Sequence, residues 1–170
     1  MKQPKIKVVG IGGCGNNIVE YLAKSGFNGV DFVCVSKGKD DMKEKKKIES
    51  ILKEVDVLFL IAGMGGIAGT RMTPTIAKLA RERGIYTSAV VTMPMEMEGK
   101  ERIEIAEKGI LELRNHVNSL IELPNTFNFP YKLVKDIPIN DLFNVVNHMA
   151  LGSIRSLVVP IKALYCSNFK

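Results

Sequence analysis

This 170-residue sequence has few of the residues that build metal clusters, disulfide frameworks or membrane spans. Its three cysteines, Cys14, Cys34 and Cys166, are odd in number and lack metal or redox spacing, so we expect free thiols and no metal site. No segment approaches the roughly 20 uninterrupted apolar residues that cross a bilayer. Residues 1–4 lead directly into an apolar strand, which does not fit a signal peptide. We therefore expect a cytoplasmic protein without a membrane span.

Aromatic residues are scarce, at 6% of the chain, and none is interleaved with the basic residues. Much of the net charge of +6 lies in residues 37–47, where acidic residues separate the lysines. Proteins that bind single-stranded nucleic acid usually place aromatic rings beside such cations. We interpret the basic segment as a solvated loop and helix, and expect no nucleic-acid partner.

Apolar runs alternate along the chain with segments of helical periodicity. Strands are predicted at residues 6–9, 32–35, 57–61, 87–92 and 119–123, and helices at residues 16–24, 43–54, 73–83 and 100–115. The runs are continuously apolar, which is typical of strands covered on both faces. This pattern predicts an α/β fold, a doubly wound and mostly parallel sheet with helices on both faces, in a single domain of residues 1–170.

The last part of the chain has a different character. Residues 124–138 are rich in Asn, Phe and Pro, and predict a long loop. Residues 141–159 predict a long helix with one broad apolar face. We expect Pro160 to close or kink that helix, because proline interrupts helical hydrogen bonding.

Two glycine-rich turns each follow a predicted strand. The first turn is Gly10-Ile11-Gly12-Gly13-Cys14-Gly15, and the second covers residues 63–69. A strand that ends in glycines and opens into a helix presents bare backbone N–H groups at a positive helix end, where phosphate binds. In parallel sheets ligands bind at the carboxyl ends of the strands, where both turns fall. Together with residues 98–102, the turns predict a nucleotide-binding domain.

These motifs resemble those of FtsZ, the bacterial and archaeal relative of tubulin. Residues 8–17 are similar to that family's first phosphate-contacting turn, and residues 62–71 to its signature AGMGGGTGTG. Segments 89–94, 98–102, 121–125 and 143–154 continue the match, so the likeness covers nearly the whole chain. The resemblance implies the family's Rossmann-like nucleotide-binding domain and a relation to cell division. It also implies GTP or GDP as ligand, with Mg²⁺ for which the sequence identifies no protein ligand.

The same resemblance implies the site residues. It assigns nucleotide contacts to Gly12, Gly13, Cys14, Gly15, Asn16 and Asn17 in the first turn, and to Gly65, Gly66, Ile67, Ala68, Gly69 and Thr70 in the second. Glu98 and Arg102 correspond to ribose and phosphate contacts, although their spacing of four also suits a surface ion pair. Asn125 and Asn147 fall where the family reads guanine, and an amide can both donate to and accept from a base. Taken alone, Asn125 is equally a turn residue and Asn147 a polar helix position.

The sequence departs from the family signature at three positions. Ile67 and Arg71 each replace a glycine, and Ala68 replaces a threonine. Ile67 would be strained if its φ had to be positive. Ala68 lacks a hydroxyl that the family uses on phosphate, a bond of about 1.5–3 kcal/mol. Arg71 either supplies positive charge near the helix start or projects into solvent.

Two further departures bear on activity. Ser36-Lys37-Gly38 stands where the family has an Asn-Thr-Asp turn, and the family's loop that senses the terminal phosphate is absent. No acidic residue follows Asp141, whereas the family carries its catalytic acids in a loop beyond the long helix. Phosphoryl transfer needs a group that positions the attacking water. We therefore expect no catalytic residues and no efficient GTP hydrolysis by the chain alone.

The expected protein partners follow from the same resemblance. A head-to-tail filament needs two complementary faces on each subunit, and this chain has only the nucleotide-bearing one. We expect it not to extend filaments alone, but to modulate filaments of full-length FtsZ, or to self-associate through the nucleotide face.

Two other interpretations stay open. Gly10, Gly12 and Gly15 fit the GxGxxG motif of dinucleotide-binding domains, but the acid expected after the second strand is missing, which leaves NADP rather than NAD. The altered signature also supports a nucleotide-free pseudo-GTPase scaffold. Competition of GTP against NADP, and a thermal shift with GTP or GDP, would separate the three interpretations.

Overall fold

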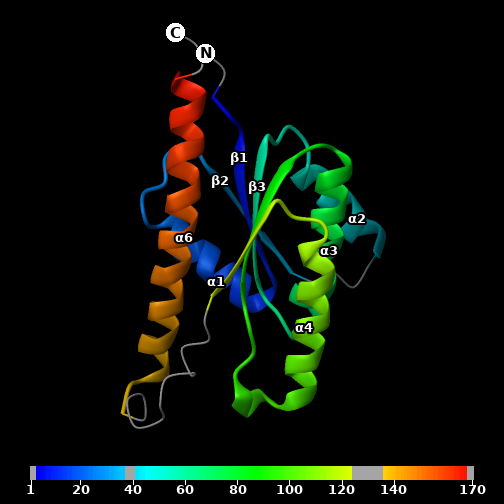
Figure 1. Ribbon diagram of the computed structural model, residues 1–170, viewed down its shortest axis with the longest axis vertical. Helices are drawn as coiled ribbons and strands as arrows, with labels where there is room; N and C mark the ends of the chain where they lie inside the picture. The colour runs from blue at the N-terminus through cyan, green and yellow to red at the C-terminus, as the bar shows by residue number, and fades with distance from the viewer. Residues whose placement is uncertain (1–2, 37–40, 124–135, 168–170) are drawn as a thin grey trace.

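The computed structural model describes residues 3–36, 41–123 and 136–167. Within these residues five parallel strands form one sheet in the order β2-β1-β3-β4-β5 (Figure 1). The strands are β1 (Ile6–Ile11), β2 (Asp31–Val35), β3 (Val57–Gly63), β4 (Tyr86–Thr92) and β5 (Ser119–Leu123). The predicted doubly wound parallel sheet is confirmed.

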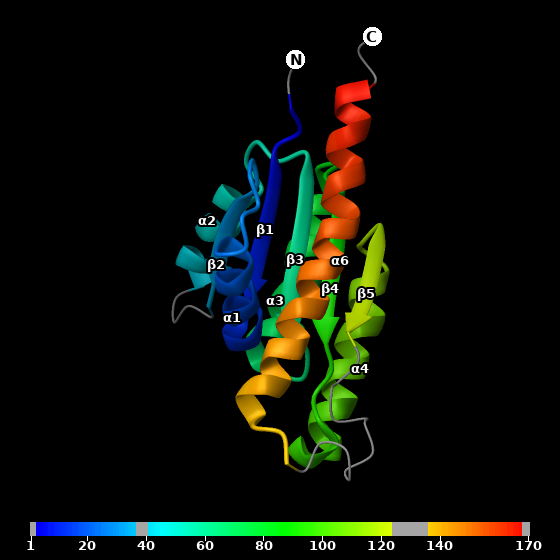
Figure 2. The ribbon, with the colours of Figure 1, turned by 90° about the vertical axis from the view of Figure 1, so that its left-hand side faces the viewer.

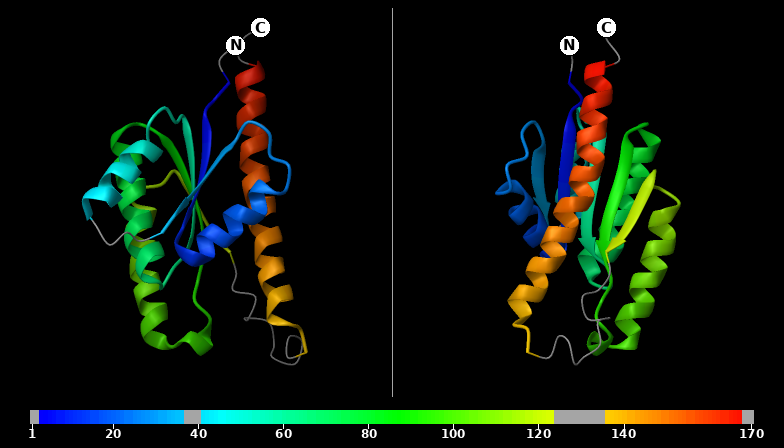
Figure 3. Two further views of the ribbon diagram at one scale, coloured as in Figure 1. Left: turned by 180° about the vertical axis from the view of Figure 1, so that it is seen from behind. Right: turned by 60° about the vertical axis from the view of Figure 1, so that its left-hand side comes forward.

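Helices cover both faces of the sheet. They are α1 (Gly12–Ala23), α2 (Asp41–Ile51), α3 (Ile67–Glu82), the 3₁₀ turn η1 (Glu96–Glu98), α4 (Lys100–Arg114) and α6 (Ile139–Ser167). Helices α1 and α6 lie on one face, where α6 crosses in front of β3 and β4, and α2, α3 and α4 lie on the other (Figure 2). The two layers stay on opposite sides of the sheet when it is seen from behind (Figure 3).

The central strand β3 shows why these residues form a sheet buried on both faces. Residues 57–62 of β3 are all buried, and successive side chains alternate between the two helical layers. Leu58 and Leu60 pack into the core beneath α2, α3 and α4. Phe59 and Ile61 pack into the core beneath α1 and α6. A continuous apolar run therefore stabilises both layers at once.

Two helices begin at least four residues earlier than the sequence predicts. α1 starts at Gly12 rather than at residue 16, and α3 starts at Ile67 rather than at residue 73. Pro74 lies inside α3 and is buried. Most of the first glycine turn is thus the first turn of α1, and the second glycine turn runs from the end of β3 into the first turn of α3, which places both helix starts next to the ends of β1 and β3.

Of the two expectations for Pro160, that it closes the last helix or kinks it, closure is wrong, because α6 continues through Pro160 to Ser167. Two cations on α6 hold it against the loop that follows α1. Arg155 donates to the Ser25 carbonyl at 3.0 Å, and Lys162 donates to the carbonyl of Asn28. The predicted loop at residues 124–138 lies mostly outside the described residues.

By length and composition, residues Asn140–Tyr165 of α6 could also cross a membrane, the one such candidate in the described part of the chain. In the structure the inner face of this helix belongs to the protein core. Ala150, Ile154 and Val158 are buried and pack with side chains of α1 and the sheet. Cores of soluble proteins contain helices of this kind as well.

Candidate functional site

The starts of α1 and α3 lie next to each other at the carboxyl end of the sheet, where the strands end. Strands β1 and β3 pair in register, with Gly10 opposite Ile61; β1 leads directly into α1, and β3 leads into α3 after three residues. Ile11 and Gly66 are the N-cap residues of α1 and α3, and neither helix start has a side-chain capping hydrogen bond in the described structure. Neither first turn contains an acidic residue. The first N–H groups of a helix have no partner within it, so both ends present hydrogen-bond donors and partial positive charge.

Gly15 and Gly69 allow these helices to approach β3. A Cβ atom at Gly15 would lie 2.2 Å from the Ile61 carbonyl oxygen, and one at Gly69 would lie 2.1 Å from the Gly63 carbonyl oxygen. Both distances are far below van der Waals contact, so no side chain fits at either position. The two glycines are required by backbone packing, whatever their relation to a ligand.

Gly65 and Thr70 shape the second turn from within. Gly65 has φ +86°, which favours glycine, and its N–H donates to the Thr70 hydroxyl at 2.8 Å. The Thr70 N–H donates in turn to the Gly66 carbonyl at 3.0 Å. These two bonds join the turn to the first helical turn of α3.

A pocket of about 480 Å³ lies between the two turns. The predicted site residues that line it are Gly12, Gly13, Cys14, Gly66, Ile67, Ala68, Gly69, Glu98 and Arg102. The structure therefore brings both turns and the residue 98–102 segment to one cavity, as the sequence predicts.

Other predicted residues lie outside that lining: Gly15, Asn16, Asn17, Gly65, Thr70 and Asn147. The Asn16 amide joins α1 to the end of β2, because it accepts from the Val35 N–H at 3.2 Å and donates to the Ser36 hydroxyl at 3.1 Å. Asn17 is exposed on α1, and Asn147 is half-buried on α6. Asn125 lies outside the described residues. Their contacts with a nucleotide stay predictions.

Sequence reasoning expected α6 to contribute Asn147, but it missed the residues of α6 that line the pocket and the segment after β4. Phe143 and Val146 reach the pocket from α6, and Met93, Pro94 and Met95 line it after β4. The Phe143 ring is 49% exposed, so it offers a flat aromatic surface on which a base can stack. The available signal was its spacing: Phe143 precedes Asn147 by four residues, which puts both on one side of a helix.

Glu98 and Arg102 form an ion pair in the wall of this pocket. The Arg102 guanidinium lies 2.8 Å from Glu98 Oε2, and Glu98 Oε1 accepts from the Met95 N–H at 2.8 Å. Gly99, with φ +100°, separates η1 from α4 and so places the carboxylate ahead of the helix. The ion pair that the spacing of four also predicts is therefore present, in the lining of the cavity, and the contacts of Glu98 and Arg102 with ribose and phosphate stay predictions.

The structure answers two questions that the sequence left open, whether Ile67 is strained and where the Arg71 side chain goes. Among the described residues Glu54 is the only non-glycine residue with positive φ, so Ile67 is not strained in the way considered above. Ile67 begins α3 and is 70% exposed. Arg71 neither supplies free charge nor projects unpaired into solvent, because it donates to both carboxylate oxygens of Glu44 on α2, at 2.9 and 3.1 Å.

Cys14 places a thiol in the pocket wall, with Sγ 3.6 Å from the Thr92 hydroxyl oxygen. Desolvation by the surrounding turns raises the pKa of the Cys14 thiol, and the negative charge of Glu98 acts in the same direction. The hydrogen bond with Thr92 lowers that pKa but does not cancel the rise. The thiol is therefore protonated at neutral pH.

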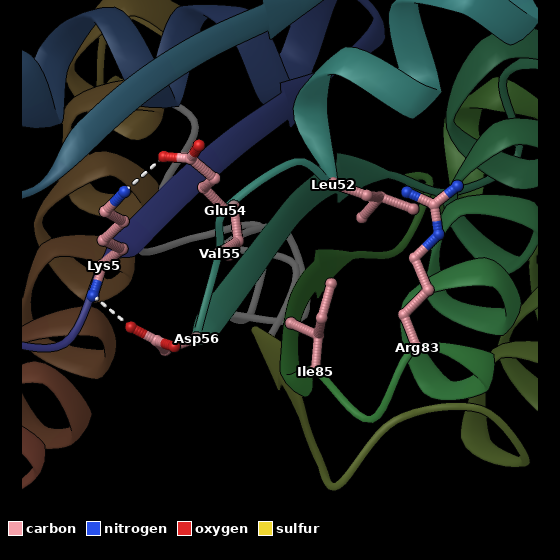
Figure 4. Close-up of a pocket in the computed structure, with 7 residues that line it drawn as sticks. All are labelled: Lys5, Leu52, Glu54, Val55, Asp56, Arg83 and Ile85. Carbon is pink, nitrogen blue, oxygen red and sulfur yellow. Dashed lines mark hydrogen bonds and ion pairs between the residues drawn. The ribbon is translucent and has the colours of Figure 1, made fainter.

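A second cavity, of about 530 Å³, lies at the amino end of the sheet, where the strands begin (Figure 4). Lys5, Glu54 and Asp56 lie on one side of it and Arg83 on the other. The Lys5 N–H donates to the Asp56 carboxylate at 2.8 Å, and the Lys5 ammonium pairs with Glu54. Although this cavity is the larger, it has neither a glycine turn nor a helix start, so we place the candidate site at the carboxyl end.

Comparisons with known proteins agree with this geometry. Residues 34–128 match the family described as "Tubulin/FtsZ family, GTPase domain". The chain is 36% identical to the cell division protein FtsZ of Coxiella burnetii, over 90% of this chain and 48% of that protein. It is 33% identical to the cell division protein FtsZ of Pseudomonas aeruginosa, over 92% of this chain and 48% of that protein. The chain thus spans about half the length of the curated relatives it matches.

Solved structures show the same fold. An empty FtsZ dimer of M. jannaschii superposes with a TM-score of 0.79 at 26% identity, over 95% of this chain and 56% of that one. CetZ from Methanosaeta thermophila superposes with a TM-score of 0.70 at 17% identity, over 91% of this chain and 54% of that one, which shows the fold alone. The family match covers more than half of the chain, and the fold and the glycine turns agree with it. The chain belongs to the Tubulin/FtsZ family.

Proposed function

We propose that this chain binds a guanine nucleotide, GTP or GDP, in the pocket at the carboxyl end of the sheet, as an FtsZ-type protein of the cytoplasm. The observation that carries the proposal is that the uncapped starts of α1 and α3 face one cavity. Each helix start acts as about half a positive charge with free N–H donors, and an anion that touches both is stabilised by both.

The parts of the pocket suit the parts of a nucleotide. The N–H groups of Gly13 and Ala68, at the starts of α1 and α3, would hold phosphate oxygens, with Arg102 beside them. The base would lie toward α6, where it can stack on Phe143 and pair with the Asn147 amide. Mg²⁺ would enter bound to the phosphates, and we assign it no protein ligand.

We further propose that these 170 residues hydrolyse GTP only slowly on their own. Glu98 is the carboxylate in the described lining of the pocket, and both of its oxygens are engaged, one by Arg102 and one by the Met95 N–H. A carboxylate held in this way does not position an attacking water. A filament partner, full-length FtsZ, would supply that group, and the chain would modulate its filaments.

Isothermal titration with GDP, GTP, ATP and NADP tests the binding proposal. We expect GDP or GTP to bind and to raise the melting temperature, because a ligand that binds only the folded state stabilises it. ATP and NADP should bind much more weakly. Binding of NADP in preference to guanine nucleotides would contradict the proposal, and no binding or thermal shift with any of the four would favour the scaffold interpretation.

Sedimentation and phosphate release test the second part. With GTP and the chain alone, we expect no pelleted polymer and little phosphate release. Mixed with full-length FtsZ, the chain should change the amount of pelleted polymer in proportion to its concentration. Robust polymers of the isolated chain, or rapid phosphate release without FtsZ, would contradict this part.

A further inference from the structure

We infer that the pocket selects guanosine diphosphate over guanosine triphosphate, and that Ile67 at the start of α3 sets this preference. The inference rests on the proposed function. It follows from three features of the described pocket: the direction of the Ile67 side chain, the loss of a hydroxyl at Ala68, and the pairing of the nearby cations.

Ile67 stands in front of the donors that would hold a terminal phosphate. It is the first residue of α3, it lines the pocket, and it is 70% exposed. In a helix each Cα–Cβ bond tilts toward the N-terminus, so a side chain at the first position projects toward an anion that caps the helix. The Ile67 side chain is branched and apolar. It occupies space there and removes water from a phosphate without donating a hydrogen bond in return.

Ala68 adds no donor at the same helix start. Its methyl group lies in the pocket wall, and a Cβ atom built on Gly12 would lie 3.4 Å from the Ala68 Cβ. A side chain at Gly12 would therefore just contact Ala68, which shows how near the two turns lie to each other at this point. The terminal phosphate of GTP would lie beyond the reach of the α1 and α3 N–H groups. It would lose bound water there, and at Ala68 no side-chain hydroxyl donates a hydrogen bond in its place.

The cations beside the pocket are already paired. Arg102 is matched by Glu98 at 2.8 Å. Arg71 lies one turn after Ile67 on the same side of α3, but its guanidinium is held by Glu44 on α2 at 2.9 Å. The net positive charge in front of the anion is thus mainly that of two helix ends, about half a charge each. This charge can offset part of a diphosphate, and the additional charge of a triphosphate is left without a partner.

Competitive titration of GDP and GTP, each in excess Mg²⁺, tests the inference. We expect GDP to bind at least about tenfold more tightly than GTP, a factor that corresponds to about 1.4 kcal/mol. Ile67→Ala keeps a good helix former while removing the branched side chain, so it should strengthen GTP binding and reduce the ratio severalfold. Leu111→Ala is the matched control, because Leu111 is 65% exposed on α4, away from the pocket, and should leave the ratio unchanged.

A second variant tests the contribution of charge. Glu44→Gln releases Arg71 without removing it, so GTP binding should strengthen more than GDP binding. Circular dichroism and thermal unfolding would confirm that each variant folds.

The outcomes separate the inference from the function on which it rests. Equal affinities for GDP and GTP, or tighter binding of GTP, would overturn the preference while leaving guanine-nucleotide binding intact. A preference for GDP that Ile67→Ala leaves unchanged would overturn the role of Ile67. Failure of both nucleotides to bind the wild-type chain would contradict the proposed function, and the inference with it.

Discussion

The two ends of the sheet use their polar groups in opposite ways. At the amino end, the charged side chains on one side of the cavity are paired: the Lys5 ammonium pairs with Glu54, and the Asp56 carboxylate accepts from the Lys5 N–H. At the carboxyl end, the backbone N–H groups that begin α1 and α3 have no side-chain caps in the described structure. The amino-end cavity is the larger, at about 530 against 480 Å³.

Because the two cavities are similar in volume, the difference in how their polar groups are used, rather than cavity size, is the reason for placing the proposed site at the carboxyl end. A ligand must replace interactions that a group already makes, so paired charges offer it little, whereas helix starts without partners offer donors at small cost. The glycines differ between the two ends in the same way. At the carboxyl end Gly15 and Gly69 are required for close packing of the helices on β3, whereas at the amino end Gly84 has nothing within 4 Å of a Cβ atom.

The largest effect is expected where glycine permits contact between α3 and β3. Gly69→Ala places a Cβ atom 2.1 Å from the Gly63 carbonyl oxygen, so the start of α3 must move. We expect a loss of about 3 kcal/mol or more, since overpacking of this kind typically costs about 1–3 kcal/mol even against side chains that can shift. Urea unfolding followed by circular dichroism measures the change.

The matched substitution at the other end is Gly84→Ala. Gly84 has φ +69° but nothing within 4 Å of a Cβ atom, so the cost is limited to backbone strain of about 1–2 kcal/mol. If Gly84→Ala destabilised the protein as much as Gly69→Ala, the close packing of α3 on β3 would not be what distinguishes the two ends.

The next largest effect concerns the two arginines. Arg102→Ala removes the cation in the carboxyl-end pocket and leaves the Glu98 carboxylate unpaired beside the phosphates, so it should weaken GDP binding about tenfold. Arg83→Ala, at the amino-end cavity, should leave the dissociation constant unchanged. Isothermal titration of both variants provides the comparison. Unchanged affinity in Arg102→Ala would remove this residue from the site.

A smaller, severalfold effect is expected on the reactivity of Cys14. Its raised pKa means that the reactive thiolate forms only at high pH, so alkylation should still accelerate with pH above the point where an ordinary cysteine reaches its plateau. Saturating GDP should slow alkylation of Cys14, which lines the pocket, and leave that of Cys34 on β2 unchanged. Peptide mass spectrometry reports each site separately. Equal protection of both cysteines would indicate a global effect rather than occupation of the pocket.

The smallest effect is expected at Glu54, beside the amino-end cavity. Its φ of 53° is unfavourable for a residue with a side chain, so Glu54→Gly should relieve strain and stabilise the protein by about 0.5–1 kcal/mol despite losing the exposed pair with Lys5. GDP affinity should not change. Thermal unfolding and titration check both statements, and weaker GDP binding would show that the amino end takes part in the site.

The sequence predicts the sheet well because its strands are long apolar runs that have no other place in a soluble fold. β3 and β5 lie within two residues of their predicted bounds. Helix starts are predicted poorly, because Gly12 and Pro74 are residues that normally avoid helices, and only packing against the sheet makes them helical. Pro160 misleads for the same reason, since contacts with the core continue α6 beyond it.

For the site, the sequence predicts the two turns and the Glu98–Arg102 pair, because their spacing is local. It cannot predict that Arg71 pairs with Glu44, since that contact joins two helices 27 positions apart. For Phe143 the sequence offers only its spacing of four from Asn147, and whether it reaches the pocket depends on how α6 lies across the sheet. What sequence reasoning misses are contacts between distant segments.

The most direct test of the central claim is the change in amide chemical shifts of the ¹⁵N-labelled chain when GDP is added. If the helix starts bind phosphate, the largest changes will be at Gly12, Gly13, Ile67 and Ala68, while Lys5, Val55 and Ile85 at the amino end stay unperturbed. Changes concentrated at the amino end, or none at saturating GDP, would contradict the account.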